Sequence, residues 1–152
     1  MKVFSNVNFV LNPPEYYKNQ YEVAIDQAYG GGTPSMDTFV LNPQIYFRAR
    51  RDSGNNLKCW LTYKIFEGEE TYVKVFVVKA DGPERVSMIT TDNQVAEDDT
   101  PYYGGRYSNH FVLNRDEEYI AIVSTFQNED PISGVFEIKA NTPLTYKLIK
   151  PL

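Results

Sequence analysis

The sequence predicts an all-β fold, an antiparallel β-sandwich of about eight strands. Apolar and polar residues alternate in several short segments, and helical periodicity is nearly absent. Aromatic residues make up 14% of the chain, mostly Tyr and Phe, and these suit the pleated surface of a sheet. Clusters of Gly, Pro, Asn and Asp separate the segments at short intervals. Short strands with such spacing are typical of two packed antiparallel sheets.

The alternation is clearest in residues 57–65 and 43–50, where every second residue is apolar. Residues 71–79 form a nearly continuous β-branched and aromatic run, which predicts a central strand buried on both faces. The remaining predicted strands are 20–27, 85–90, 109–113, 117–126, 134–140 and 144–149.

We expect the strands at 43–50 and 57–65 to pair as a hairpin. Matching their apolar faces sets Phe47 opposite Leu61, with Ile45 opposite Tyr63 and Ala49 opposite Cys59, and turns the Cys59 side chain toward the core. The same register sets Arg48 beside Trp60 and Arg50 beside Lys58 on the outer face. This face is a candidate binding site made of cations and a tryptophan: Arg48, Arg50, Lys58, Trp60 and Lys64. Such a patch can meet lipid phosphates or an acidic protein surface. The alternative is an ordinary charged face on which Arg48 stacks on Trp60.

Composition narrows the classes of partner. The formal net charge is −5, which argues against nucleic acid as a partner. The single cysteine cannot form an internal disulfide and favours a reducing, cytoplasmic location. No apolar run approaches the roughly 18 residues of a transmembrane segment, so we expect none.

Acidic residues in the predicted loops are candidate calcium ligands, because hard cations are held by several oxygen atoms. The candidates are Asp81, Glu97, Asp98 and Asp99. The alternative is that these loops are simply solvated, as acidic loops usually are.

Cys59, His110 and Asn114 occur in the order used by papain-like cysteine proteases. A catalytic cysteine has a lowered pKa, which the start of a helix or a neighbouring cation provides. Cys59 instead lies in the middle of a predicted strand and faces the core. We therefore expect a chain without catalytic residues.

Two stretches carry a family resemblance. Residues 30–45 contain a glycine pair, a later Thr-Phe, and then Asn-Pro-Gln followed by Ile. Residues 118–126 read Glu-Tyr-Ile-Ala-Ile-Val-Ser-Thr-Phe, and 134–138 read Gly-Val-Phe-Glu-Ile. These stretches resemble the C2-like β-sandwich, or domain III, of calpain-type cysteine proteases, and the resemblance covers roughly residues 30–141. Val123 and Glu117 stand where the family usually has Pro and Gly.

The resemblance implies a calpain-type C2-like β-sandwich over residues 30–152, preceded by an N-terminal extension or linker with edge strands at 1–29. It implies a non-catalytic module that docks against a calpain protease core, other protein partners or anionic phospholipid, under some influence of calcium. The alternative function is that of a carbohydrate-binding β-sandwich, which the 12 tyrosines and Trp60 suggest.

Overall fold

The computed structural model describes residues 17–25, 31–50, 54, 56–67, 72–95, 101–126 and 132–150; at 17–25, 67 and 132 it describes the backbone alone. These residues form β1 (Tyr17–Ile25), the short 3-10 helix η2 (Asp37–Leu41), β2 (Gln44–Ala49), β3 (Leu57–Glu67), β4 (Tyr72–Ala80), β5 (Tyr103–Gly104), β6 (Arg106–Leu113), β7 (Glu118–Thr125), β8 (Ile132–Ala140) and β9 (Leu144–Leu148). Within the described part of the chain, no helix has the length and apolar character needed to cross a membrane.

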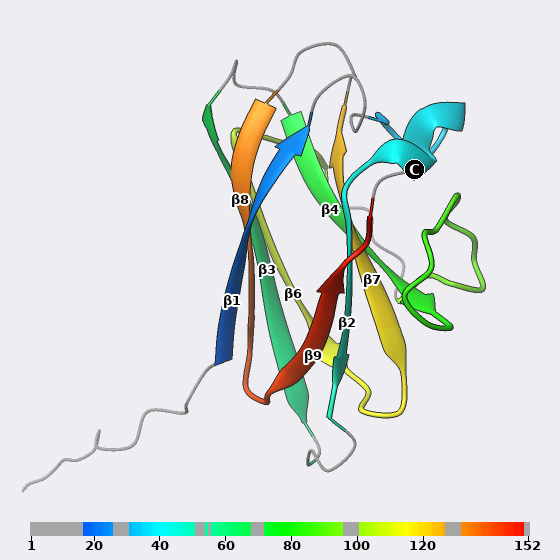
Figure 1. The fold of residues 1–152 in the computed structure, drawn as a ribbon, viewed down its shortest axis with the longest axis vertical. Helices are drawn as coiled ribbons and strands as arrows, with labels where there is room; N and C mark the ends of the chain where they lie inside the picture. Colours follow the sequence, from blue (N-terminus) through cyan, green and yellow to red (C-terminus); the bar gives the residue numbers. More distant parts are fainter. Residues whose placement is uncertain are drawn as a thin grey trace, which may run out of the picture.

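The strands form two packed antiparallel sheets (Figure 1). Sheet A has the order β1-β8-β3-β6, and sheet B has the order β5-β4-β7-β2-β9. Apart from β9, the strands pair as β1 with β8, β2 with β7, β3 with β6 and β4 with β5. This nested pairing is the arrangement of a jelly roll, in which the chain crosses repeatedly between the two sheets. The predicted all-β sandwich is therefore confirmed.

The main core fills the space between the sheets. Cys59, Leu61 and Tyr63 of β3 are almost completely buried, whereas the residues between them face outward. Phe47 of β2 stacks on a tyrosine of β7, with ring centroids 5.6 Å apart. The alternation in 57–65 thus reflects a strand with one face in the core and the other outside.

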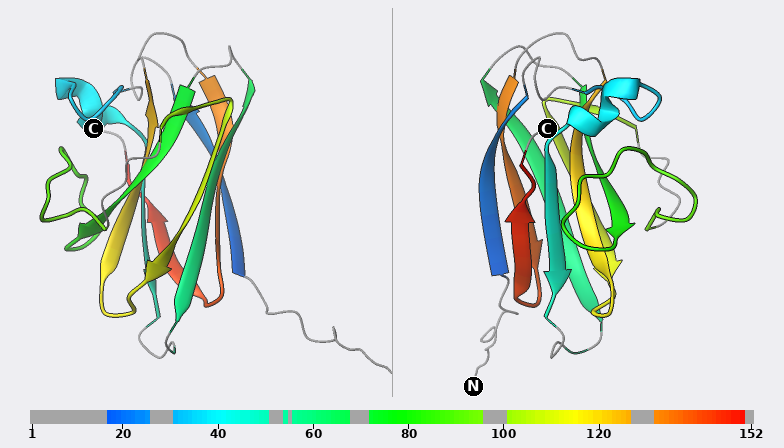
Figure 2. Two further views of the ribbon diagram at one scale, coloured as in Figure 1. Left: turned by 180° about the vertical axis from the view of Figure 1, so that it is seen from behind. Right: turned by 45° about the vertical axis from the view of Figure 1, so that its right-hand side comes forward.

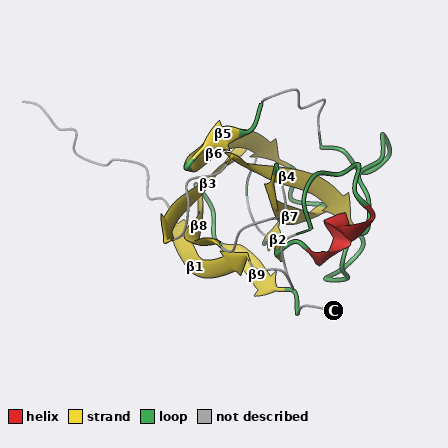
Figure 3. Cartoon of the chain, turned by 90° about the horizontal axis from the view of Figure 1, so that it is seen from above, coloured by secondary structure: helices red, strands yellow, loops and turns green. Residues whose placement is uncertain are grey.

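A second, smaller hydrophobic cluster lies on the outer side of sheet B. The helix η2 and the loop 81–95 cover that side, as Figures 2 and 3 show. Its buried members are Phe39, Tyr46, Val78, Ile120, Ile122 and Ile149. Seven of the eight residues of β7 are buried, because this strand has apolar neighbours on both faces.

The predicted strand at 85–90 is wrong, because this segment is a loop clamped onto sheet B by side chains. Arg85 donates a hydrogen bond to the carbonyl of Asn42 at 2.6 Å. The Gln44 amide bonds both backbone groups of Val86, each at 2.8 Å. These side-chain bonds satisfy backbone groups that a neighbouring strand would otherwise pair.

The predicted hairpin is also wrong, because its two strands belong to different sheets. β2 pairs with β7 and β9, and β3 pairs with β6 and β8. The link between β2 and β3 carries the chain from one sheet to the other, as the jelly-roll order requires. The apolar faces were nevertheless assigned correctly: Phe47 and Cys59 are fully buried, and they contribute to one core from opposite sheets. The strand predicted at 20–27 is found at Tyr17–Ile25, at one edge of sheet A.

Candidate functional site

The outer side of sheet A is the strongest candidate site, since no described segment lies over it (Figure 3). We call its outward-facing residues in β3, β6 and β8 the open face. Its described members include Lys58, Trp60, Thr62, Lys64, Arg106, Ser108, His110, Val112, Val135, Glu137 and Lys139.

The open face is positively charged although the whole chain is acidic. Four of its named members are lysine or arginine and one is a glutamate, whereas the formal net charge of the chain is −5. Negative charge must therefore be concentrated elsewhere in the chain. A local excess of cations attracts anions to this side of the molecule.

Trp60 lies at the centre of the open face. In the register of the sheet it is paired with His110 on β6 and with Lys139 on β8. Its side chain is half-buried, while His110 is exposed. An aromatic side chain in this position offers apolar contact area between charged neighbours.

Two cations face each other near one end of the open face. Lys64 of β3 and Arg106 of β6 are paired directly in the antiparallel register, and both are exposed. Among the described residues neither has a carboxylate partner. In the next pair on the same face, two residues along each strand, the hydroxyls of Thr62 and Ser108 are 3.3 Å apart. This corner therefore combines two positive charges with two hydroxyl groups.

The predicted basic patch is divided between the two sheets. Lys58, Trp60 and Lys64 share the open face, as predicted, but Arg48 lies on sheet B. There Arg48 is 3.9 Å from Glu118, which also accepts a hydrogen bond from the hydroxyl of Tyr46 at 2.5 Å.

The predicted proximity of Arg48 to Trp60, and of Arg50 to Lys58, is consequently wrong. Arg50 directly follows the end of β2 and is exposed. Both errors arise from the assumption that consecutive strands pair with each other.

Sequence reasoning missed Arg106 and Lys139. The strand predicted at 109–113 begins three residues earlier in the structure, and those residues continue the same alternation of exposed and buried side chains. Lys139 was within a predicted strand. Its position beside Trp60, however, depends on the pairing of β8 with β3, which the local pattern does not contain.

The structure does not bring the protease-like trio together. Cys59 is fully buried in the core, and burial raises the pKa of its thiol. Its neighbour on β6 is Phe111, so the exposed His110 lies on the opposite face of sheet A. Asn114 belongs to the turn between β6 and β7.

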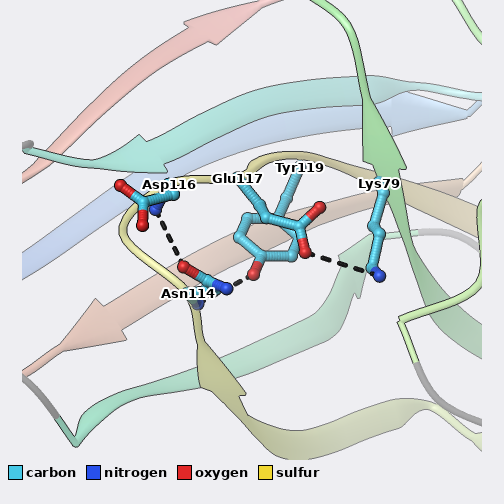
Figure 4. Close-up of polar contacts among 5 residues, drawn as sticks. All are labelled: Lys79, Asn114, Asp116, Glu117 and Tyr119. Atoms are coloured by element: carbon cyan, nitrogen blue, oxygen red, sulfur yellow. Dashed lines mark hydrogen bonds and ion pairs between the residues drawn. The ribbon is translucent and has the colours of Figure 1, made fainter.

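That turn is held by local hydrogen bonds, drawn in Figure 4. The backbone N–H of Asn114 donates to the hydroxyl of Tyr119 at 2.8 Å, and its side-chain oxygen accepts from the backbone of Asp116 at 2.9 Å. Glu117 forms an ion pair with Lys79 at 3.4 Å. Asn114 therefore has a structural role in a tight turn.

The calcium candidates fall on two kinds of segment. Asp81 is exposed in the turn that follows β4, while Glu97, Asp98 and Asp99 lie outside the described residues. Across the described part of the chain, no three His, Cys, Asp or Glu side chains are grouped so that they could hold a metal ion.

The two stretches that carry the family resemblance meet in the structure. The carbonyl of Gly32 accepts hydrogen bonds from the side chains of Asn42 and Ser124, both at 2.8 Å. The side-chain oxygen of Asn42 also accepts the N–H of Gly31 at 2.8 Å. A side chain at Gly31 would overlap the carbonyl oxygen of Thr38, so only glycine fits there. These residues form a buried polar contact that joins η2 to β7.

No family model matches the chain. No curated protein matches it at a significant level.

Proposed function

We propose that this chain is a non-catalytic docking module of a calpain-like protein, and that its open face binds an acidic surface of a protein partner. The observation that carries the proposal is the contrast between a cationic open face and an acidic chain. Complementary charge steers partners to such a face and raises the rate of association.

Trp60 supplies the second element of a docking surface. Tryptophan and arginine are enriched among residues that dominate binding energy at protein interfaces. Here Trp60 is bordered by Lys139 and His110, and Arg106 lies on the same face. An acidic partner with one apolar side chain near its centre would match this arrangement.

The calpain-like part of the proposal rests on the resemblance of residues 30–45 and 118–126, and the contact between them supports it. Gly32 and Asn42 belong to the first stretch and Ser124 to the second. Their side chains and backbone are used for packing and hydrogen bonding in the fold. The module would therefore contribute recognition, while catalysis belongs to another part of such a protein.

The test measures binding of the chain to immobilised poly-glutamate at low and physiological salt. We expect binding that weakens as salt is added, because the attraction is between exposed charges. The double reversal Lys58→Glu with Lys64→Glu should abolish it. The matched control, Lys147→Glu with Lys150→Glu, makes the same charge change on exposed residues of sheet B and the C-terminal segment, and it should retain some binding.

Two further probes separate this proposal from its rivals. Vesicles of phosphatidylcholine with phosphatidylserine test phospholipid as the partner, and a glycan array tests the carbohydrate-binding alternative. Binding to poly-glutamate that depends on Lys58 and Lys64 supports protein docking. Binding only to vesicles, or only to glycans through Trp60, would contradict it.

A further inference from the structure

The paired cations Lys64 and Arg106 point to a more specific ligand than an acidic surface in general. Directly opposed residues of antiparallel strands have Cβ atoms about 5 Å apart, and like charges in such a pair destabilise a sheet. Both side chains are exposed, and no described carboxylate neutralises them. Within the described part of the fold the pair is thus unfavourable, and a bound anion would make it favourable.

The backbone that carries this pair is hydrogen-bonded between neighbouring segments. Gly105 adopts a positive φ of 76°, which lets the chain turn from β5 in sheet B into β6 in sheet A. Its carbonyl accepts a hydrogen bond from the N–H of Ile65 at 2.9 Å. On the other side of the cation pair, β3 and β6 continue to pair at Tyr63 and Tyr107, so the two side chains project from backbone that is paired on both sides.

The charge and donors of this corner fit a phosphate monoester. Such a group carries a charge of about −1.5 to −2 at neutral pH and has three strong acceptor oxygens. Arg106 can donate two parallel hydrogen bonds and Lys64 adds a second positive charge. The hydroxyls of Thr62 and Ser108 lie two residues along each strand, roughly 7 Å away. A carboxylate would neutralise only one of the two cations.

Trp60 offers a second contact for a ligand, at a fixed distance from Lys64. It is four residues from Lys64 on β3, which corresponds to about 13 Å along an extended strand. A peptide lying extended on the open face would place an aromatic side chain on Trp60 and a phosphorylated residue at the cation pair when the two are four residues apart.

We propose that the open face recognises a phosphorylated segment of a partner protein, with Lys64 and Arg106 holding the phosphate and Trp60 contacting an apolar residue four positions away. This inference rests on the proposed docking function. A peptide is favoured over a membrane because the acidic chain as a whole is repelled by an anionic bilayer, whereas a short segment meets only the local cations.

The experiment titrates the chain with acetyl-Gly-Phe-Gly-Ser-Gly-phosphoSer-Gly-amide, and in parallel with the same peptide carrying plain Ser. Calorimetry gives the affinity, and the fluorescence of Trp60, the single tryptophan, reports contact with the open face. We expect the phosphopeptide to bind at least about tenfold more tightly, since a charge-assisted bond is stronger than a neutral one.

Matched variants locate the site. Lys64→Gln with Arg106→Gln should reduce phosphopeptide affinity at least about tenfold, to the level of the plain peptide. Lys147→Gln with Lys150→Gln removes the same charge away from the open face and should leave the affinity unchanged. Circular dichroism of each variant checks that the fold is retained.

Each other outcome overturns the inference. Equal affinity for the two peptides, or no effect of the Lys64 and Arg106 substitutions, would remove the phosphate site. Binding only to phosphatidylcholine vesicles that contain a phosphoinositide would assign the pair to a membrane instead. If poly-glutamate still binds in these cases, the proposed docking function survives without the phosphate site; if it does not, both fail.

Discussion

The two outer faces of the sandwich differ in what lies over them and, as a consequence, in how exposed their side chains are. On sheet B, η2 and the loop 81–95 bury Val78, Ile120 and Ile122. On sheet A, no described segment covers the outer side chains, and Val112 remains 68% exposed. Both sheets share one central core, so the two outer faces differ only in their covering: side chains of sheet B are buried there, and those of sheet A remain accessible.

The cations on the two faces also differ in whether a carboxylate lies beside them. Arg48 on sheet B is only 18% exposed and has Glu118 beside it, so its positive charge is neutralised within the fold. Lys64 and Arg106 on sheet A have no such described partner and face each other directly. Under the proposed function, a cation stabilises the fold where a face is covered and is left for a ligand where it is not. Three pairs of substitutions test this comparison between the covered side of sheet B and the exposed parts of the molecule.

The largest difference is expected between two asparagines that each bridge two backbone groups. Asn42 is fully buried and bonds the N–H of Gly31 and the carbonyl of Gly32. Asn42→Ala should lower the free energy of unfolding by about 2–4 kcal/mol, because the N–H of Gly31 is left buried without this partner. Urea unfolding followed by circular dichroism measures the change.

The control for this substitution is Asn141→Ala. Asn141 makes the same two kinds of bond, to the N–H of Lys58 and the carbonyl of Asn56, but it is exposed. Water can replace both bonds, so we expect a loss below about 1 kcal/mol. Equal losses for the two asparagines would show that burial on the side of sheet B does not decide the effect.

A smaller difference is expected between two outward-facing valines. Val78→Ala removes two methyl groups from the covered face of sheet B, where the side chain is fully buried, and should cost about 2 kcal/mol. Val112→Ala makes the same change on the open face and should remain within about 0.5 kcal/mol. The same unfolding experiment measures both. A large loss for Val112→Ala would mean that the open face is packed against another part of the chain.

Much of the fold was predictable from local pattern. β3 alternates because one of its faces is in the core and the other is open, and the alternation in 57–65 correctly placed Cys59 inside and Trp60 outside. Residues 119–123 of β7 form a continuous apolar run because both faces of this strand are covered. The spacing of apolar residues indicates how many faces of a strand are buried, and it can be seen within the sequence of that strand alone.

The pairing of strands was not predictable in the same way. Consecutive strands usually lie side by side, and this expectation placed Arg48 beside Trp60. In the jelly-roll order, β2 and β3 lie in different sheets, and the true neighbours of Trp60 come from β6 and β8. The local pattern could indicate which residues face outward, but the membership of the candidate site depends on contacts between distant parts of the chain.

The smallest expected effect is on the free energy of unfolding when one positive charge is removed from each face, and its sign should be opposite on the two faces. Lys64→Gln removes one of two directly opposed cations, so it should raise the free energy of unfolding by about 0.2–0.5 kcal/mol. Arg48→Gln breaks the partly buried pair with Glu118, so it should lower that free energy by about 0.5–1 kcal/mol. Urea unfolding at low ionic strength measures both without adding a screening salt, and repeating it with added salt should shrink both changes. Opposite signs are required if the cation of Lys64 is kept for a ligand and that of Arg48 for the fold. A loss of stability in both variants would show that Lys64 also stabilises the protein, and the cation pair would then no longer argue for an anion site.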